Sequence, residues 1–301
     1  MSRTTPHPMS RAIDLSRLPP PDVVEPVDYE TILAAMKADL AARWPDFQDG
    51  PHMAGDPLVK LLEVAAYWVT LVHQRVNDAS RATMLATATG ADLDNLAALL
   101  GVERLTVVPG NDDADPVMEP DADLRRRAAL ALEGYPTAGS VGAYRFHALS
   151  ADGRVADVGV ASPAPGEVVV TVLVRDGDGT PDAELLARVT ERLTADRVRP
   201  LTDLVTVRAA QVTPVAIRAR LLVEPGPAVE TVRSAADSAV RAYLAERHRL
   251  GAVLALSGLA AALHQPGVRR VLLDAPTADT DPGADGVAHA TDIEITAEVV
   301  S

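Results

Sequence analysis

The chain of 301 residues contains no cysteine. Its folded state therefore cannot rely on disulfide bonds, and a metal site built from thiolates is excluded. Aromatic residues make up only 3% of the sequence, whereas alanine, valine and leucine supply most of the 48% that is apolar. The hydrophobic cores should therefore be aliphatic, and a chain of this length is expected to form two or three domains.

Positive charge is also scarce. Lys37 and Lys60 are the only lysines, and the formal net charge at pH 7 is −14. Binding to a phosphate backbone requires a clustered basic face. The densest basic run, Arg125-Arg126-Arg127, follows acidic residues and is interpreted as a helix surface that faces solvent or a neighbouring subunit. We therefore expect no nucleic-acid partner.

Long hydrophobic runs are missing as well. The longest nearly apolar segment, residues 251–263, is too short to cross a bilayer and contains Ser257. Residues 1–21 lack the apolar centre of a signal peptide. The sequence thus predicts a soluble protein that is made in a cytoplasm and has no membrane partner.

Recognisable catalytic and metal-binding patterns are absent from the sequence. The seven histidines are scattered, and no two of them have the i, i+4 spacing of a helical metal site. His73 is interpreted as a polar position of the helix bundle, and His147 and His264 as satisfied core or interface histidines. The segment AGSVG around Ser140 has Ala138 where the nucleophile elbow of a hydrolase requires glycine. We expect no cofactor, no metal ion and no enzymatic activity.

The most informative stretch of the sequence runs from Asp56 to Val102. Asp56 followed by Pro57 is a strong helix start, because the carboxylate can accept hydrogen bonds from free N–H groups and proline has none to lose. Nothing interrupts the helical pattern before Gly90, so a helix of about 34 residues, or about 50 Å, is predicted. Gly90 should end this helix, and a short helix capped by Asp92 should fold back against it.

The apolar residues of the predicted long helix fall on two neighbouring lines. The first line has the alternating spacing of four and three residues that is typical of supercoiled helices. A helix that is apolar over so much of its circumference needs neighbours on two sides. The predicted contact residues of a helix bundle are Leu58, Leu61, Leu62, Ala65, Trp68, Val69, Val72 and Val76.

Several segments resemble the J-type baseplate proteins of contractile-tailed phages. They are DPLVKLL at residues 56–62, HQRVND at 73–78, ATGADLDNLAALLGVERL at 88–105 and the segment 132–158. The resemblance covers most of the chain from about Tyr29 onward. These are packing and turn motifs, so their combination is what identifies the family.

The resemblance implies a structural role in a tail baseplate. In this family, two copies of the J-like chain join a smaller partner in a wedge, and their long helices share a bundle. Six wedges close into a ring around the tail hub, beside the hub and sheath-initiator proteins. On host contact the ring widens and passes a signal to the sheath. The resemblance also implies a virion protein that is assembled in the cytoplasm of a bacterial host.

The remaining sequence predicts an α+β fold in which a long-helix bundle region precedes two small mixed-sheet modules. The expected segments are an arm at 1–27, a helical bundle domain at 28–110, a linker at 111–123, an α+β module at 124–212 and a second α+β module at 213–301. The arm either orders against a partner or is a floppy terminus. Hinges are expected in the linker and at Thr213-Pro214.

The predicted linker is rich in acidic residues and contains two prolines, which favours a solvated connection. A calcium site remains an alternative here and in the acidic turns at 176–178 and 279–285, since hard cations prefer carboxylate oxygens. An EF-hand is excluded because its ordered ligand spacing is absent.

Each α+β module is expected to combine strands with helices. The first should contain a helix at 123–132, a helix capped by Ser140, strands at 155–160 and 168–174, a helix opened by Thr180 and Pro181, and a strand at 204–207. The second should contain a strand at 215–223, helices at 227–248 and 257–264, strands at 268–273 and 293–299, and a loop at 274–291.

Two classes of function follow from this sequence. The first is the structural wedge subunit that the resemblance implies. The second is a phage- or cell-associated hydrolase whose site is assembled from residues far apart in the chain. The lack of a strong catalytic motif and the long helix that is apolar on two sides favour the structural protein.

Overall fold

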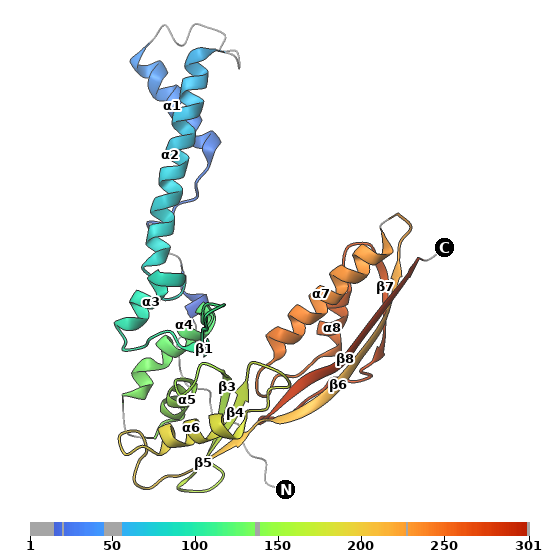
Figure 1. Ribbon diagram of the computed structural model, residues 1–301. Coiled ribbons are helices and arrows are strands. Elements are labelled where there is room, and N and C mark those ends of the chain that lie inside the picture. The colour runs from blue at the N-terminus through green and yellow to red at the C-terminus, as the bar shows by residue number, and fades with distance from the viewer. Residues whose placement is uncertain (1–14, 20, 45–55, 136–138, 227, 300–301) are drawn as a thin grey trace. The chain divides into compact units, whose positions relative to one another are not determined.

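The computed structural model describes residues 15–19, 21–44, 56–135, 139–226 and 228–299 (Figure 1). The described residues fall into two compact units, one that ends at Glu103 and one that begins at Arg104. The first unit is helical, and the second contains all the described strands. The fold is therefore α+β, as the sequence predicted.

The helical unit is built from two packed helices and two short ones. A short 3-10 helix, η1 (Leu15–Arg17), precedes α1 (Tyr29–Arg43), α2 (Pro57–Ala82) and α3 (Gly90–Ala98). The Asp56 carboxylate accepts a hydrogen bond from the Leu58 N–H at 2.8 Å, and Asp28 caps α1 in the same way at Thr31. As predicted, α1 packs against α2; the connection between them lies outside the described residues.

The helix α2 is shorter than predicted. It ends at Ala82, because the Thr83 hydroxyl donates to the Ser80 carbonyl at 2.8 Å and the Thr87 hydroxyl donates to the Arg81 carbonyl at 2.6 Å. These bonds satisfy carbonyl groups that a longer helix would have bonded to its own backbone. Gly90, with φ of +54°, is the first residue of α3 and does not end α2. The prediction of a single helix up to Gly90 was wrong.

The N-terminal arm contacts α2 through a buried asparagine. The Asn77 side chain donates to the Glu25 carbonyl at 2.7 Å and accepts from the Glu25 N–H at 3.2 Å. Both polar ends of the amide are thus paired with the backbone, which is what a buried asparagine requires. This contact places the described part of the arm against α2 of the same chain.

The first α+β module combines a hairpin, a mixed sheet and helices. Its sheet has the order β3-β4-β5, in which β3 is antiparallel and β5 parallel to the central strand. Its elements are β1 (Thr106–Val108), β2 (Val117–Met118), α4 (Asp121–Leu130), η3 (Ala131–Gly134), α5 (Val141–Leu149), β3 (Val155–Ala161), β4 (Glu167–Val174), α6 (Ala183–Thr194) and β5 (Leu204–Ala209). As predicted, Ser140 caps α5 by accepting from the Ala143 N–H. Asp182, rather than the predicted Thr180 and Pro181, opens α6.

One face of this sheet carries an aliphatic core. Alternate residues of β4 are buried against α5 and α6, where their partners include Leu185, Val189 and Leu193 of α6. The alternation is that of a strand with one face against helices. The predicted mixed sheet with helices on one face is confirmed.

The segment predicted as a solvated linker contains ordered structure. Residues 111–123 include β2, which pairs with β1, and the start of α4. Glu119, buried just after β2, pairs with the buried guanidinium of Arg127 on α4; their Oε2 and Nε atoms are 3.1 Å apart. Arg127 was predicted to lie on a surface, but it anchors the hairpin to the helix.

The second α+β module repeats the plan of a mixed three-stranded sheet. The order is β7-β6-β8, with β7 antiparallel and β8 parallel to the central strand. Its elements are β6 (Gln211–Val223), α7 (Val229–Arg247), α8 (Leu256–Leu263), β7 (Val268–Ala275) and β8 (Gly286–Val299). Figure 1 shows α7 and α8 on one face of the sheet, where they bury its core. The predicted loop at 274–291 is too long, because β8 begins at Gly286.

The two modules join through a single residue, Ala210, between β5 and β6. Ala210 is buried with Leu173 of β4 and Val287 of β8. Asp157 of β3 also accepts from the Leu250 N–H at 3.2 Å. The expected hinge at 213–214 was wrong, because these residues lie inside β6 and pair with β8.

Breaking the buried pair between Glu119 and Arg127 should destabilise this unit. Glu119→Gln removes the negative charge opposite the buried Arg127 guanidinium, and breaking a buried ion pair in this way costs about 3–5 kcal/mol of unfolding free energy. The midpoint of urea unfolding should fall accordingly. Glu230→Gln, which removes one partner of the exposed pair with Arg233, is the matched control and should leave the midpoint close to that of the wild type.

Candidate functional site

The helix α2 exposes a continuous apolar line to solvent. The exposed fraction is 65% for Leu61, 62% for Trp68 and 58% for Val72. Leu58, Val64 and Val76 are exposed as well. Contiguous apolar surface of this kind is unusual on a monomeric protein and marks an interaction site.

On its opposite side, α2 is covered by other residues of its own chain. Val59, Ala66 and Asn77 are buried there. At about 100° per residue, these three positions fall on one face, and Leu61, Trp68 and Val72 fall on the face turned away from it. The helix is therefore apolar on two sides, and the described chain covers one of them.

The predicted bundle residues divide between exposed and half-buried positions. The exposed ones are Leu58, Leu61, Trp68, Val72 and Val76. The half-buried ones are Leu62, Ala65 and Val69. The structure therefore places the half-buried residues partly against the helix's own neighbours and leaves the others uncovered. We call the exposed residues, together with Val64, the apolar face of α2.

Tyr67 was not among the predicted residues, although 54% of it is exposed. Its ring meets the Trp68 ring edge to face, with centroids 6.1 Å apart. Adjacent exposed aromatic residues are a signal that could have been used, since tyrosine and tryptophan are enriched in protein interfaces. Beside this face, an ion pair between Lys60 and Glu63, with Nζ and Oε2 2.7 Å apart, forms part of a polar side.

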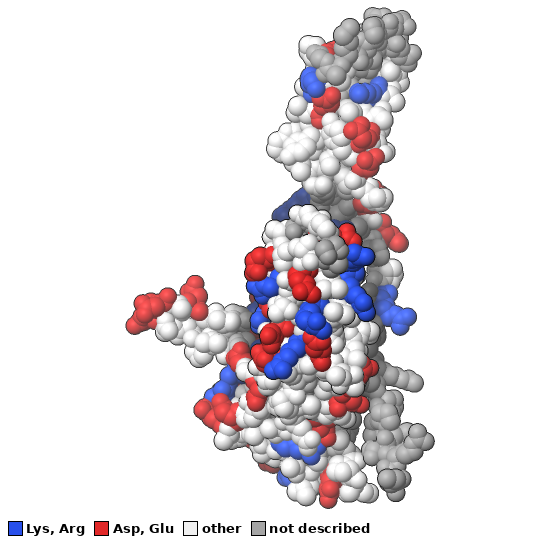
Figure 2. All heavy atoms as spheres, turned by 90° about the vertical axis from the view of Figure 1, so that its right-hand side faces the viewer, with Lys and Arg blue, Asp and Glu red and all other residues white. Residues whose placement is uncertain are grey.

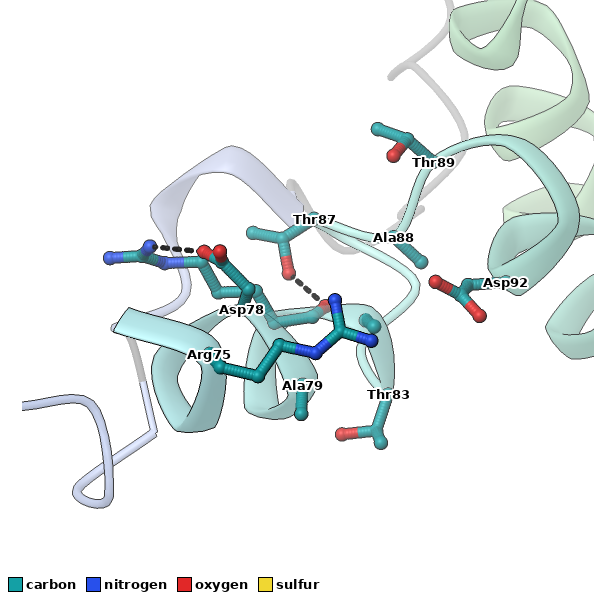
Figure 3. Close-up of a pocket in the computed structure, with 10 residues that line it drawn as sticks. Arg75, Asp78, Ala79, Thr83, Thr87, Ala88, Thr89 and Asp92 are labelled. Atoms are coloured by element: carbon teal, nitrogen blue, oxygen red, sulfur yellow. Dashed lines mark hydrogen bonds and ion pairs between the residues drawn. The ribbon is translucent and has the colours of Figure 1, made fainter. Parts of the chain in front are cut away.

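A hollow of about 570 Å³ lies at the C-terminal end of α2. Figure 3 shows the Arg75 side chain reaching across it between Thr83 and Thr87, with Asp92 of α3 on the other side. Both threonine hydroxyls donate to main-chain carbonyls. Neither of these two hydroxyls is thus paired with a base that could activate it.

A second cavity, of about 220 Å³, contains Tyr144 and Asp203. The Tyr144 hydroxyl donates to the Asp203 carboxylate at 2.7 Å. Burial, reinforced by this carboxylate, raises the pKa of Tyr144 well above its usual range. The tyrosine therefore stays protonated at neutral pH, so it is not a nucleophile for the hydrolase alternative.

The described residues offer no assembled metal centre. No three His, Cys, Asp or Glu side chains among them cluster in a way that could hold a metal ion. His147 uses its Nε2 atom to bond the Gly134 carbonyl at 3.1 Å. None of the helices in the described ranges has the length and apolar composition needed to span a membrane.

Charge on the molecule is mixed in sign. Figure 2 shows basic and acidic side chains interspersed on the visible face of the described residues. Within the basic triplet, Arg126 pairs with Asp123 and Asp157, and Arg127 pairs with Glu119. These guanidinium groups are therefore engaged by carboxylates and do not form a phosphate-binding patch.

Comparison with known proteins gives a consistent result along the chain. Family models of the Baseplate J-like N-terminal domain, the Baseplate J-like central domain and the Baseplate J-like protein C-terminal domain match residues 55–111, 136–209 and 215–296. Baseplate protein J of Escherichia phage P2 is 47% identical over 276 residues, which cover 89% of this chain and 91% of that protein.

A solved structure of the anti-feeding prophage baseplate, determined by cryo-electron microscopy and symmetrised six-fold, contains a similar chain. The TM-score is 0.42 and the sequence identity 17%, and the match covers 59% of this chain and 43% of that one.

Trp68 reports directly on whether the apolar face of α2 becomes covered. In a Trp44→Phe variant it is the only tryptophan, and its emission should shift to shorter wavelength when the protein self-associates or binds a partner, because the indole leaves water. Fluorescence titration measures the shift. The Trp68→Phe variant, which retains only Trp44, is the control. Emission from Trp68 that stays unchanged in an associated sample would contradict this assignment.

Proposed function

This chain belongs to the Baseplate J-like family, and on that premise we propose that it is a wedge subunit of a contractile-tail baseplate. Family models cover most of the chain, and the phage P2 protein matches nearly its whole length. Membership of a structural family gives the coarse role of a baseplate subunit. The wedge, its partners, the ring and the trigger are the finer parts of the proposal.

The apolar face of α2 is the observation that supports a wedge. We propose that it packs against the α2 helix of a second copy and against a helix of a smaller wedge protein. Fully burying an exposed Leu or Val side chain stabilises a complex by about 1.5–3 kcal/mol. Because association itself costs at least about 4 kcal/mol, the residues along the helix must be buried together for a stable bundle.

The α+β unit would supply the contacts between wedges. A contact between two different surfaces of the same chain produces either a closed ring or an open filament, depending on the rotation between neighbours. We propose closure into a sixfold ring around the tail hub, next to hub and sheath-initiator proteins, as the family resemblance implies. This unit suits that role because its two modules are joined by buried contacts at Ala210 and Asp157.

The proposed trigger follows from the difference between the bundle contacts within a wedge and the contacts between wedges. Bundle contacts through aliphatic side chains should persist, while polar contacts between wedges should rearrange when the ring widens on host contact. The signal would then pass to the sheath. The protein would act in the virion tail after assembly in the bacterial cytoplasm.

A hydrolase remains the alternative, but neither the hollow beside α2 nor the cavity at Tyr144 and Asp203 favours it. The threonine hydroxyls in the hollow beside α2 are bonded to carbonyls, and Tyr144 is held in its protonated form by burial. Neither place provides an activated nucleophile with an adjacent base. The structural role is therefore the better-supported function.

A charge on the apolar face of α2 should prevent wedge formation without unfolding the chain. Val72 is mostly exposed in the single chain, so Val72→Asp should leave circular dichroism and thermal unfolding nearly unchanged. In the bundle, the same carboxylate would be buried without a partner. Co-purification with a tagged second copy and with the smaller wedge protein should be lost.

The matched control is Gln74→Asp, which adds the same charge on the exposed polar side of α2. It should retain co-purification at the wild-type level. Survival of the complex in the Val72→Asp variant would show that the face is misassigned, and loss of the complex in both variants would show that the effect is not specific to this face.

A further inference from the structure

The strongest unexplained feature of the α+β unit is a pocket whose charged side chains are all positive. It has a volume of about 250 Å³, and its lining includes Tyr135, His147, Arg192 and Arg197. We call these four residues the basic pocket. In a chain whose net charge is −14, an uncompensated cluster of this kind is conspicuous.

Neither arginine of the basic pocket has an ion-pair partner within the described chain. The Nε atom of Arg192 is buried and makes no hydrogen bond to any described residue. A buried donor without a partner is unfavourable. The nearby positive charges of Arg197 and Arg127 make the charged form of Arg192 still less favourable. The pocket therefore lacks a negative ligand.

His147 narrows the chemistry of that ligand. Its Nε2 atom donates to the Gly134 carbonyl, which leaves Nδ1 as an acceptor in the neutral ring. This atom is buried and has no partner among the described residues. Burial and the nearby Arg192 lower the pKa of His147, which favours the neutral ring at pH 7. The positive charge of the pocket is thus carried by its two arginines, which can donate to a carboxylate.

An acidic peptide segment supplies a carboxylate together with apolar side chains, whereas a simple inorganic oxyanion supplies only the negative charge. The volume is below the about 300–1,000 Å³ that is usual for pockets of small molecules, so it suits the tip of a loop. Tyr135, which is 71% exposed, and Leu132 on η3, which is 67% exposed, add apolar surface on the same segment. A loop with an acidic tip and an apolar stem would therefore complement the charge and the apolar surface of the basic pocket.

The hairpin formed by β1 and β2 has those properties. At its tip, Asp112, Asp113 and Asp115 are exposed and have no ion-pair partner within the described chain. The Asn111 side chain accepts from the N–H groups of Asp113 and Ala114, both at 2.9 Å, which holds the turn in one conformation.

The stem of the hairpin is apolar, with exposed residues that include Val108, Val117 and Met118. A purely solvated turn does not require such a stem, whereas a docking segment does.

We propose that the basic pocket of one copy binds the acidic hairpin tip of a second copy. This inference rests on the proposed function, because it supplies the head-to-tail contact between chains that a ring requires. The aspartates would pair with the guanidinium groups of Arg192 and Arg197. Arginine and carboxylate pairs of this kind are strong when partly desolvated.

The absence of cysteine from the chain allows a direct test by disulfide trapping. One full-length chain carries Ala114→Cys at the hairpin tip, and another carries Asp196→Cys, an exposed position between the two arginines of the pocket. Mixed and mildly oxidised, they should form a disulfide-linked dimer. The control replaces Asp196→Cys by Glu184→Cys, which is exposed at the other end of α6, and should give at least about tenfold less dimer.

Charge reversal shows whether the contact is electrostatic. Arg197→Glu in the Asp196→Cys chain should lower the yield of dimer by about tenfold, and Asp112→Arg with Asp113→Arg in the other chain should restore it. Circular dichroism establishes that each variant is folded. Coupling no better than the Glu184→Cys control would overturn the proposal. Inorganic phosphate that occupies the pocket of the full chain while no dimer forms would also overturn it, by showing a free oxyanion as the occupant.

Failure of this contact is distinguishable from failure of the wedge. The Arg197→Glu variant should still co-purify with its bundle partners, because the apolar face of α2 is untouched. A trapped dimer that persists in a Val72→Asp chain would support the pocket contact independently of the bundle. Absence of the trapped dimer in a chain that forms the bundle normally would reject the pocket contact alone.

Discussion

The helix α2 has more apolar surface than the described chain covers, and the wedge role proposed for the protein rests on that imbalance. α1 and the arm occupy one side, through residues such as Val59 and Asn77. The other side leaves Leu61, Trp68 and Val72 in water. Each of these residues would gain only about 1.5–3 kcal/mol on burial, which is small against the entropy lost on association. A long helix solves this problem by presenting many such residues in one line, so that they are buried in a single event.

In the α+β unit, by contrast, buried carboxylates find their partners within the unit. Glu119 pairs with Arg127, and Asp157 with Arg126, Arg145 and the Leu250 N–H. Since a buried charge without a partner is costly, these pairs hold the hairpin, the helices and both sheets in fixed positions. The basic pocket departs from this pattern, because Arg192 and Arg197 have no ion-pair partner among the described residues, and the proposed contact with a second copy rests on that departure.

Predictions from the sequence succeeded where short-range chemistry decides the structure. Asp56 with Pro57 began α2, Ser140 capped α5, and alternating valines gave β4. They failed where the outcome depends on partners distant in the chain. In the segment 111–123, residues 111–118 are exposed, as a solvated connection would be, but they form a hairpin with β1, and Glu119 is buried against Arg127. The loop at 274–291 was too long because β8 gains its register from β6, which lies far earlier in the chain.

By itself, the sequence determined the class of the fold, the start of the long helix and the presence of apolar residues on two of its sides, because helical periodicity and capping act within a few residues. Only the tertiary structure decided which of those sides stays uncovered, since that depends on where α1 and the arm pack. Tertiary structure alone also gathered His147, Arg192 and Arg197 into one pocket. Residues on separate elements meet only when long-range packing brings those elements together, and no local pattern in the sequence encodes that meeting.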